Sequence, residues 1–509
     1  MQITDTQHTT TLAALIAAVE VKQAAGPDAA GVQISALTGD SRAVTPGALF
    51  VAVRGVNVDA HKFIPQAVAA GAAAIVCEEL PTVADAAVAY IVVPDSAIAL
   101  GQLASQWYGN PSQKLTLVGV TGTNGKTTIA TLLYDMARLA GHKAGLLSTV
   151  ANKIDGTIYP ADHTTPDPLQ LNRLLAEMVS HGCSFAAMEV SSHAAAQHRI
   201  AGLTFAGGIF TNITRDHLDY HKTFKNYLDA KKSFFDGLPA SAFAITNIDD
   251  RNGDIMIQGT AARRYTYSLQ MPADFTAQVI EDRIEGMVMH FSDTVAAGAD
   301  PHASTTDVTT NFVGRFNASN LLAVYGAARL LGFDAVDALR GISMLHPVAG
   351  RFQTFTGEGG ITAIVDYAHT PDALANVLDT INQVVGKCHA VITVCGCGGN
   401  RDRGKRPIMA AEAARRSDRV ILTADNPRDE DPSAIIDEML AGLDEEARER
   451  TLTIVDRRQA IRTAVALATA GDVVLVAGKG HEDYQETANH HREHFDDREE
   501  VSKALHIIS

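Results

Sequence analysis

One short segment constrains the fold more than any other part of this 509-residue chain. The apolar run Leu115–Val120 has the length of a buried strand and leads into the glycine-rich sequence Gly119-Val-Thr-Gly-Thr-Asn-Gly-Lys-Thr-Thr128. Apolar residues then recur at helical spacing up to a glycine that can end the helix: Ile129, Leu132, Leu133, Met136, Leu139 and Gly141. The order predicts a strand, a glycine loop and a helix.

Such a loop binds phosphates, because the backbone N–H groups and the dipole of the helix start both favour anions. Lys126 can reach the outer phosphates, and the Thr127 hydroxyl can bind Mg²⁺. The alternative, a glycine-rich turn with an exposed lysine, is disfavoured by the flanking strand and helix. The strict phosphate-loop pattern has glycine where this chain has Val120. ATP is favoured over GTP, because we find no N-K-x-D base-reading sequence. The predicted ATP-binding residues of the loop are Gly122, Thr123, Asn124, Gly125, Lys126, Thr127 and Thr128.

The chain is long enough for about three domains of roughly 150 residues. Residues 1–97 contain short apolar runs separated by Gly, Pro and Asp, which indicates a small α/β domain. Residues 98–346 hold the glycine loop and further apolar runs that each end in polar residues, as parallel strands with functional loops do. Within them, the alternating segment 262–310 could form antiparallel hairpins. Residues 347–509 repeat the alternation of apolar runs and helical segments. We therefore expect an α/β protein with a small N-terminal domain, a central mostly parallel sheet and a C-terminal Rossmann-like, doubly wound domain.

Composition excludes several classes of protein. The 42 basic and 58 acidic side chains give a net charge of −16, which argues against bulk binding to nucleic acid or to an anionic membrane. Five cysteines are too few and odd in number for a disulfide framework. The first residues do not resemble a signal peptide, and no long uninterrupted apolar window is present. We expect a cytoplasmic protein without membrane insertion.

Six ordered motifs support a more specific interpretation. They are 119–128, Met188-Glu-Val-Ser-Ser-His193, Gln197-His-Arg199, Phe210-Thr-Asn-Ile-Thr-Arg-Asp-His-Leu-Asp-Tyr-His221, Asp366-Tyr-Ala-His-Thr-Pro-Asp372 and Gly478-Lys-Gly-His-Glu482. The first resembles the ATP loop of the Mur ligases, whose wider superfamily includes the folylpolyglutamate synthases. Together the motifs resemble the Mur ligases that extend a UDP-muramoyl dipeptide to a tripeptide, over nearly the whole chain.

The resemblance implies an ATP-dependent amide ligase that phosphorylates a carboxylate and exposes the acyl phosphate to an amine. Both steps concentrate negative charge, so they need Mg²⁺ and aimed donors. The implied magnesium ligands are Thr127, Glu189, His217 and Lys231. Lys231 matches a carbamylated lysine of the family, and the A-K-x-x-F spacing favours it over Lys232. Considered alone, Glu189 would be a solvated strand-end carboxylate, His217 a loop histidine and either lysine an exposed helix charge.

Further nucleotide contacts are implied on both sides of the boundary near residue 347. Asn317 resembles the family's adenine-side residue, although capping of a helix that begins at Leu321 is a competing explanation. Arg351 resembles an arginine that meets ATP when the domains close, and Gln353 replaces an expected acidic residue nearby. Asp366 and His369 would face the nucleotide from the third domain. The candidate catalytic residues are Lys126, Lys231 and His369. His369 is a candidate general base, and the substrate phosphate is the alternative base.

The implied sugar-nucleotide substrate is UDP-MurNAc-L-Ala-D-Glu. Hydroxyls, amides and a guanidinium suit a ligand rich in hydroxyls, phosphates and carboxylates. His163 stands where asparagine is expected. Without the resemblance, Asp40-Ser-Arg42 would be read as a simple turn. The implied contacts are Ser41, Asn57, Thr164, Thr165, Ser191, Gln197 and Arg199.

The sequence Asp425-Asn-Pro-Arg428 marks, by resemblance, ligases that add meso-diaminopimelate instead of lysine. Arg428 could bind the distal carboxylate that lysine lacks, and lysine would leave the guanidinium unpaired. Glu482 suits a substrate ammonium. Taken alone, this sequence would be a proline turn. The implied contacts are Arg401, Asp425, Asn426, Pro427, Arg428, Gly478 and Glu482.

We therefore expect a monomeric ligase of peptidoglycan precursor synthesis that uses ATP, Mg²⁺ and two small-molecule substrates, with no nucleic acid partner. Three alternatives stay open. A lysine-adding ligase is opposed by D-N-P-R. A folylpolyglutamate synthase is opposed by the resemblance of the first domain to a uridine-binding domain. A P-loop NTPase would hydrolyse ATP without either co-substrate.

Overall fold

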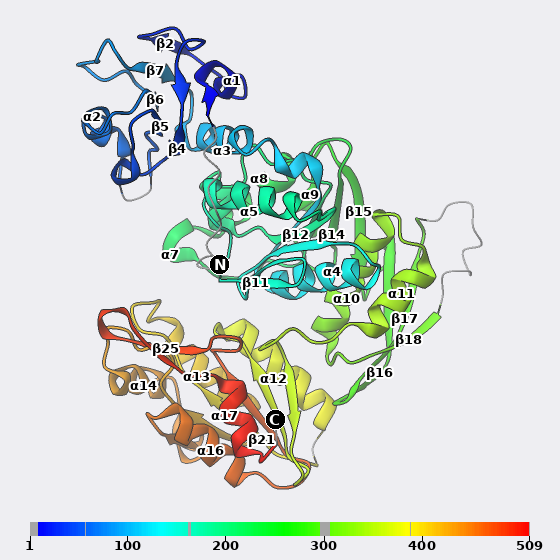
Figure 1. The fold of residues 1–509 in the computed structure, drawn as a ribbon. Coiled ribbons are helices and arrows are strands. Elements are labelled where there is room, and N and C mark those ends of the chain that lie inside the picture. Colours follow the sequence, from blue (N-terminus) through cyan, green and yellow to red (C-terminus); the bar gives the residue numbers. More distant parts are fainter. Residues whose placement is uncertain (1–8, 56–57, 161–163, 296–305, 387, 508–509) are drawn as a thin grey trace.

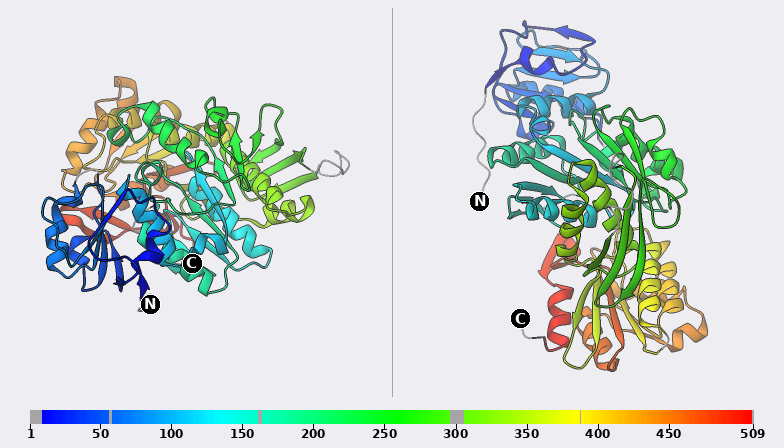
Figure 2. Two further views of the ribbon diagram at one scale, coloured as in Figure 1. Left: turned by 90° about the horizontal axis from the view of Figure 1, so that it is seen from above. Right: turned by 90° about the vertical axis from the view of Figure 1, so that its right-hand side faces the viewer.

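The computed structural model describes residues 9–55, 58–160, 164–295, 306–386 and 388–507. Three β-sheets follow one another along the molecule, from the N-terminal part through the central part to the C-terminal part, as two perpendicular views show (Figures 1 and 2). Asn57 and His163 lie outside the described residues. In the described part of the chain, no helix has the length and apolar character needed to cross a membrane.

The N-terminal sheet has the order β2-β7-β6-β5-β4 and is parallel except for β2. Its strands are β2 (Gln23–Ala25), β4 (Ala36–Thr38), β5 (Ala48–Val51), β6 (Ala74–Cys77) and β7 (Ala89–Val92). One face packs against α1 (Leu12–Ile16) and α3 (Ser96–Trp107), and the other against α2 (Ile64–Ala69). The expected small α/β unit is confirmed. A separate two-stranded pair joins β1 (Thr10–Thr11) to β3 (Gln33–Ile34).

The central sheet has eleven strands in the order β11-β10-β9-β12-β8-β13-β14-β15-β16-β17-β18. The strands from β9 to β16 in this order run parallel, and both edges are antiparallel. The hairpins expected within 262–310 are present, although β15 belongs to the parallel part. The strands are β8 (Thr116–Thr121), β9 (Ala144–Leu147), β10 (Asn152–Ile154), β11 (Thr157–Tyr159), β12 (Phe185–Glu189), β13 (Gly207–Phe210), β14 (Phe243–Asn247), β15 (Arg263–Ser268), β16 (Phe275–Arg283), β17 (Gly286–Asp293) and β18 (Thr306–Thr310).

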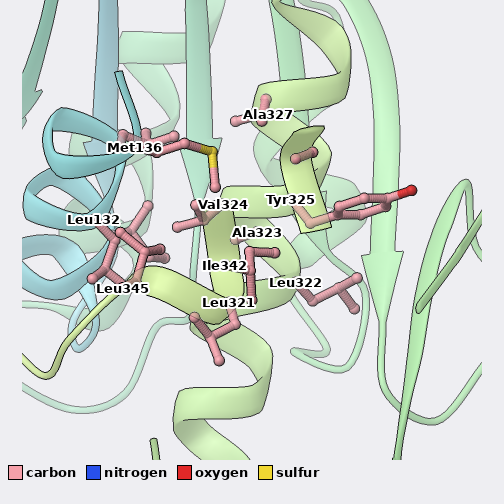
Figure 3. Packing of buried hydrophobic residues seen from close by; sticks show 14 of the residues in the cluster. Leu132, Met136, Leu321, Leu322, Ala323, Val324, Tyr325, Ala327, Ile342 and Leu345 are labelled. Carbon is pink, nitrogen blue, oxygen red and sulfur yellow. The ribbon is translucent and has the colours of Figure 1, made fainter. Parts of the chain in front are cut away.

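Alternate residues of β8 serve the two faces of this sheet. Val118 and Val120 join the core with α4 (Lys126–Leu139), α10 (Arg315–Leu330) and α11 (Ala335–Met344), whose packing Figure 3 shows. Leu117 joins the opposite core with α5 (Pro168–Ser180), α8 (Phe224–Asp236) and α9 (Gly253–Ile257). A Cβ at Gly119 would lie 2.6 Å from the Phe234 ring, so the first glycine of the loop motif makes room for the packing of α8.

The C-terminal sheet has the order β19-β20-β24-β21-β22-β23 and is parallel except for β19. Helices cover both faces, so the doubly wound arrangement is confirmed. The strands are β19 (Gln353–Thr356), β20 (Thr362–Asp366), β21 (Val391–Cys395), β22 (Arg419–Leu422), β23 (Thr451–Thr453) and β24 (Val473–Ala477). One face packs on α12 (Pro371–Val385), α13 (Lys405–Arg416) and α14 (Pro432–Leu440), the other on α16 (Arg457–Leu467) and α17 (Asp497–Ala504).

Smaller elements complete the chain around these sheets. Near the carboxyl ends of the central strands lie α6 (Ser192–Ala196) and α7 (Leu218–His221). In the C-terminal part, α15 (Glu445–Glu449) precedes β23, and β25 (Tyr484–Thr487) pairs with β26 (His491–His494).

A fully buried ion pair joins α16 to α17. Arg457 Nε and Nη2 donate to the two carboxylate oxygens of Asp497, each over 2.8 Å, and Nη2 also donates to the Ala477 carbonyl at the end of β24. Removing one member of such a pair leaves an uncompensated buried charge. The pair therefore fixes the helices beneath the carboxyl end of the central strand β24.

We predict that Asp497→Ala lowers the opening free energy of α16 and α17 by about 3–5 kcal/mol. The reason is that the Arg457 guanidinium stays buried without its partner. Hydrogen-exchange mass spectrometry of peptides from the two helices measures the change. Glu499→Ala, which removes an exposed partner of Lys503, should leave exchange almost unchanged. Equal effects of the two substitutions would contradict the prediction.

Candidate active site

The glycine loop connects β8 to α4, as the sequence predicts. Gly122 has φ +152° and Gly125 has φ +87°, conformations that L side chains rarely adopt. A Cβ at Gly125 would lie 2.6 Å from Oδ1 of Asn320, so α10 approaches the loop closely. The two glycines let the backbone turn with its N–H groups at the start of a helix, the geometry that binds phosphate.

The loop is held in place by the segment that follows β13. Thr123 N donates to Asn212 O over 2.8 Å, and Asn124 N donates to Asn212 Oδ1 over 2.9 Å. In return, Thr211 Oγ1 donates to Asn124 O over 2.6 Å. Thr211 and Asn212 lie in the motif 210–221, but the sequence analysis gave them no role. Their position directly after a strand could have indicated that they lie beside the glycine loop.

Lys126, the first residue of α4, has its ammonium against the loop. Nζ donates to Gly122 O over 3.0 Å and to Thr123 O over 2.8 Å. Burial lowers the pKa of Lys126, although the carboxylates of Glu189 and Asp216 act in the opposite direction. A cation in this environment is strongly attracted to phosphate, because so little water screens it.

Glu189 ends β12 and is only 1% exposed. Its Oε1 accepts a hydrogen bond from Thr149 N over 2.7 Å, and Thr149 Oγ1 lies 3.2 Å from Oε2. The interpretation as a solvated strand-end carboxylate is therefore wrong. A buried, oriented carboxylate beside the phosphate loop has the chemistry of a magnesium ligand.

Lys231 and Lys232 differ sharply in environment. Lys231 is 1% exposed on α8, and its Nζ donates to Gly122 O over 2.6 Å. Burial, reinforced by the charge of Lys126, lowers the pKa of Lys231 well below its ordinary value. Lys232 instead pairs with Asp236 on the outer side of the helix. The surroundings of Lys231 thus favour the neutral amine that carbamylation requires.

His217 precedes α7 with a left-handed backbone, at φ 53°. Although 44% of its side chain is exposed, partial removal of the ring from water lowers its pKa to about 4. The charge of Asp216, 3.4 Å away, opposes the shift, and His193, Lys126 and Lys231 add to it. Its ring meets that of His193 edge to face at 4.9 Å between centres. Neutral imidazole is the form that binds metals.

Glu189, His217 and Lys231 are not sufficient for a metal site built from protein alone. Within the described ranges, no three His, Cys, Asp or Glu side chains converge as metal ligands. Mg²⁺ usually takes one or two protein carboxylates and completes its shell with substrate phosphates and water. The donors present fit that pattern.

The expected substrate contacts of the central part form one network. Thr165 Oγ1 donates to Glu189 O over 2.8 Å and accepts from Ser191 N over 3.2 Å. Arg199 Nη1 donates to Thr165 O over 2.8 Å, and its Nε donates to Gln197 Oε1 over 3.0 Å. Thr165 and residues from two of the motifs, 188–193 and 197–199, are thus brought together beside the predicted magnesium ligand.

Two further residues expected to contact the sugar nucleotide, Thr164 and Ser41, lie outside this network. Thr164 Oγ1 lies 3.0 Å from Thr149 Oγ1, which links it to the Glu189 carboxylate. Ser41 begins a short 3₁₀ turn on the N-terminal sheet, where Asp40 accepts from Arg42 N. The turn expected for Asp40-Ser-Arg42 is present, with Ser41 buried.

Asn317 lies inside α10, because the helix begins at Arg315 and not at Leu321. Its Nδ2 donates to Val313 O over 2.9 Å, so the capping explanation tied to a later helix start is wrong. Asn317 Oδ1 lies 3.4 Å from Asn320 Nδ2. Both asparagines therefore occupy the first turns of the helix that touches the phosphate loop.

Arg351 connects the central and C-terminal parts. Its Nη2 donates to Thr127 Oγ1 over 3.2 Å, and its guanidinium lies 4.6 Å from the centre of the Tyr367 ring. The Gln353 carboxamide oxygen accepts from Gly350 N over 2.9 Å, which is a role that a carboxylate oxygen could also fill. A Cβ at Gly350 would lie 2.2 Å from Gly480 C, so the two backbones are in direct contact.

Asp366 and His369 follow β20. Burial raises the pKa of Asp366, and its two oxygens accept from Phe352 N and Ala368 N, each over 2.7 Å. Its carboxylate thus braces the backbone that carries Arg351. Burial also lowers the pKa of His369, whose Nδ1 lies 2.8 Å from Tyr367 O. Because a carbonyl only accepts, Nδ1 carries the proton and Nε2 keeps its lone pair.

The residues expected to bind the incoming amino acid gather at the carboxyl ends of β22 and β24. Asn426 Nδ2 donates to Glu482 Oε2 over 2.8 Å. A Cβ at Gly478, where φ is +122°, would lie 2.8 Å from Asp425 Oδ2. Pro427 then carries the chain to Arg428. Glycine is required at 478 for the two loops to approach this closely.

Arg428 has a partner that its own loop does not reveal. Its Nε lies 3.3 Å from Glu486 Oε2, and its Nη1 donates to Gly399 O over 2.9 Å. The argument that lysine would leave this guanidinium unpaired therefore needs correction, because Glu486 already provides a carboxylate. Arg401 is exposed, and a Cβ at Gly398 would lie 3.0 Å from Arg428 Nη1 and 3.8 Å from Arg401 Cγ.

Sequence reasoning missed two residues of this region. Tyr367 donates from its hydroxyl to Glu482 Oε1 over 3.3 Å while its ring lies beneath Arg351. Lys479 is completely buried between Asn426 and Glu482. Tyr367 lies in the motif 366–372 and Lys479 in the motif 478–482. An aromatic residue or a lysine among charged neighbours was the feature of these motifs that could have indicated a role.

We predict that Gly122→Ala weakens ATP binding by about 10-fold or more, the equivalent of one lost charged hydrogen bond. The added Cβ would lie 1.9 Å from Thr211 Oγ1 and 3.0 Å from Asn212 O, so the loop must move from its support. Isothermal titration with Mg-ATP measures the affinity. Gly141→Ala is the matched control, because its φ is also positive, at +82°, and nothing lies within 4 Å. Unchanged ATP affinity in Gly122→Ala would contradict the prediction.

Three family models cover most of the chain. They are the "Mur ligase family, catalytic domain" over residues 33–108, the "Mur ligase middle domain" over 120–328 and the "Mur ligase, glutamate ligase domain" over 350–480. A solved structure titled as that of a UDP-N-acetylmuramoyl-L-alanyl-D-glutamate--2,6-diaminopimelate ligase matches with a TM-score of 0.70 and 33% identity, covering 98% of this chain and 99% of that one.

Similarity in sequence is closer still. A protein of Parabacteroides distasonis, named UDP-N-acetylmuramoyl-L-alanyl-D-glutamate--2,6-diaminopimelate ligase, is 58% identical over 96% of this chain and 97% of its own length. A folylpolyglutamate synthase of Thermotoga maritima shares only the fold, with a TM-score of 0.56 and 14% identity over 75% of this chain and 89% of that one. The chain belongs to the Mur ligase family.

Proposed function

We infer that this chain is an ATP-dependent ligase that joins meso-diaminopimelate to the D-glutamate of UDP-MurNAc-L-Ala-D-Glu in peptidoglycan precursor synthesis. One observation carries the inference. Arg351 donates a hydrogen bond to Thr127 at the phosphate loop, and its guanidinium lies over the ring of Tyr367. The Tyr367 hydroxyl donates to Glu482, one of the residues expected to bind the amino acid. A nucleotide and an acceptor amino acid would thus lie side by side, as an amide ligase requires. The 58% identical relative bears the corresponding name.

In the first step, an oxygen of the D-glutamate side-chain carboxylate attacks the γ-phosphorus of ATP, and the bond to ADP breaks. The loop residues 122–128 hold the phosphates through backbone N–H groups, and Lys126 balances the charge that develops on the transferred group. Asn317 and Arg351 would contact the nucleotide from α10 and from the start of the C-terminal part. Asp366 supports Arg351 through the backbone N–H of the next residue, Phe352.

In the second step, the neutral amine of diaminopimelate attacks the acyl carbon, and the tetrahedral intermediate releases phosphate to leave an amide. The amine must also lose a proton. His369 can accept it at Nε2, since the hydrogen bond of Nδ1 to Tyr367 O fixes the tautomer. The departing phosphate is the alternative acceptor.

The proposed magnesium site uses Thr127, Glu189, His217 and a carbamate on Lys231. When bound, Mg²⁺ would neutralise phosphate charge and polarise the transferred group. The support for the carbamate is chemical. Lys231 is buried beside Lys126, where an ammonium is disfavoured and a carbamate would convert the side chain into an oxygen-bearing anion.

The remaining site assignments follow the resemblance of the sequence motifs, and Asn57 lies outside the described residues. Ser41, Asn57, Thr164, Thr165, Ser191, Gln197 and Arg199 would hold the UDP-muramoyl dipeptide. Arg401, Asp425, Asn426, Pro427, Arg428, Gly478 and Glu482 would hold diaminopimelate. We place the domain boundaries near residues 97 and 346. We also propose that the protein is a cytoplasmic monomer.

The first test measures ADP release with ATP, Mg²⁺ and UDP-MurNAc-L-Ala-D-Glu, in the presence of meso-diaminopimelate, L-lysine or no amino acid. We expect turnover with diaminopimelate alone. Turnover with lysine would keep the ligase and refute the assigned amino acid. ADP release that needs neither co-substrate would refute the ligase and favour a P-loop NTPase.

A second test addresses the carbamate. After equilibration with ¹³C-bicarbonate, the wild-type protein should show a carbamate carbon resonance in its NMR spectrum. Lys231→Met should abolish it, because the buried amine is removed. Lys232→Met is the matched control and should retain the signal, since Lys232 is paired with Asp236 outside the site. A signal that survives Lys231→Met, or its absence from the wild type, would contradict the assignment.

A further inference from the structure

Lys479 is a completely buried lysine at the centre of the expected amino-acid site. Its Nζ donates to Asn426 Oδ1 over 2.9 Å and lies 3.2 Å from Glu482 Oε2 and 3.8 Å from Asp425 Oδ1. The Tyr484 ring centre is 5.5 Å from the same atom. One ammonium therefore contacts both loops that form the site, 425–428 and 478–482.

Stability alone does not explain a lysine at this position. Burying an ammonium is costly unless it is paired, and an apolar residue of similar volume often stabilises a core equally well. The two carboxylates beside it do need a cation. Arg457 lies near Asp425, but its guanidinium is already engaged by both oxygens of Asp497. Lys479 is thus the cation that Asp425 and Glu482 share.

Lys479 also fixes which way the Asn426 amide points. Asn426 Oδ1 accepts from both Lys479 Nζ and Glu486 N, the latter over 2.9 Å. The NH₂ group must then face Glu482, to whose Oε2 it donates over 2.8 Å. If the amide were flipped, its NH₂ group would face two other donors, Lys479 Nζ and Glu486 N, and its oxygen would face the Glu482 carboxylate.

We propose that Lys479 is a positioning residue for the acceptor amino acid, which holds Asp425, Asn426 and Glu482 in the one arrangement that binds it. The proposal rests on the proposed function, because it takes these residues as the diaminopimelate site. Lys479 itself need not touch the substrate.

The arrangement predicts how the site changes without the ammonium. Burial and the neighbouring charge of Asp425 raise the pKa of Glu482, and Lys479 opposes this rise, with Asn426. The other titratable groups facing Glu482 are Tyr367, which donates to Oε1, and Tyr484. Loss of the Lys479 charge would raise the pKa of Glu482 further. At a given pH more of its carboxyl groups would then hold a proton, and the protonated form binds a substrate ammonium poorly.

The test compares the KM values of Lys479→Met for diaminopimelate, ATP and the UDP-muramoyl dipeptide with those of the wild type. We expect the KM for diaminopimelate to rise about 10-fold or more, the size expected for losing interactions with a charged group, while the other two stay within about 2-fold. Raising the pH toward 9 should lower the elevated KM of the variant, because Glu482 loses its proton again. Lys503→Met, at an exposed lysine of α17, is the matched control.

A double-mutant cycle with Glu482→Gln separates positioning from general destabilisation. Glu482→Gln should raise the KM for diaminopimelate without relief at high pH, and adding Lys479→Met should have little further effect. An unchanged KM for diaminopimelate, equal rises in all three KM values, or additive effects in the cycle would overturn the proposal. A wild-type enzyme that uses another amino acid would refute the proposed substrate instead, and the same comparison would then be made with that amino acid.

Discussion

The contact between Arg351 and Thr127 joins two halves of a site that are built on separate sheets. The phosphate loop belongs to the central sheet, whereas Arg351 begins the C-terminal part and is supported there by Asp366. The two halves also meet through apolar packing, because Val313 belongs to the core of the C-terminal sheet and the Phe316 ring contacts that of Phe352, with 5.6 Å between centres. Chemistry between ATP and an amino acid would require both halves, and the contact between Arg351 and Thr127 is a polar link between them at the phosphate loop.

Two buried lysines and one half-buried lysine show how the surroundings of a cation differ within the expected site of a chain with a net charge of −16. Lys126 is held by two loop carbonyls, which phosphate oxygens can replace. Lys231 contacts one carbonyl and lies near Lys126, and this favours the neutral amine. Lys479 is surrounded by an amide oxygen and two carboxylates. The same side chain therefore serves three purposes, and the immediate neighbours decide which one.

The sequence was sufficient for the features that depend on local pattern. The apolar runs predicted the parallel strands, and the glycine loop predicted the β8–α4 turn. The start of α10 was misplaced because Asn317 resembles a capping residue, whereas the helix begins at Arg315 without a side-chain cap and Asn317 donates back to Val313 O from inside it. The burial of Glu189 depends on Thr149, forty residues away. Glu486 meets Arg428 only because β25 folds back over the D-N-P-R loop, which no local pattern reveals.

The direct backbone contact between Gly350 and Gly480 couples two parts of the expected site through the main chain alone. No side chain separates the segment that leads to Arg351 from the loop that carries Lys479 and Glu482. A side chain at either position would push the nucleotide-side arginine and the acceptor loop apart at once. A substitution of one of these glycines would therefore disturb the binding of the nucleotide and of the amino acid together.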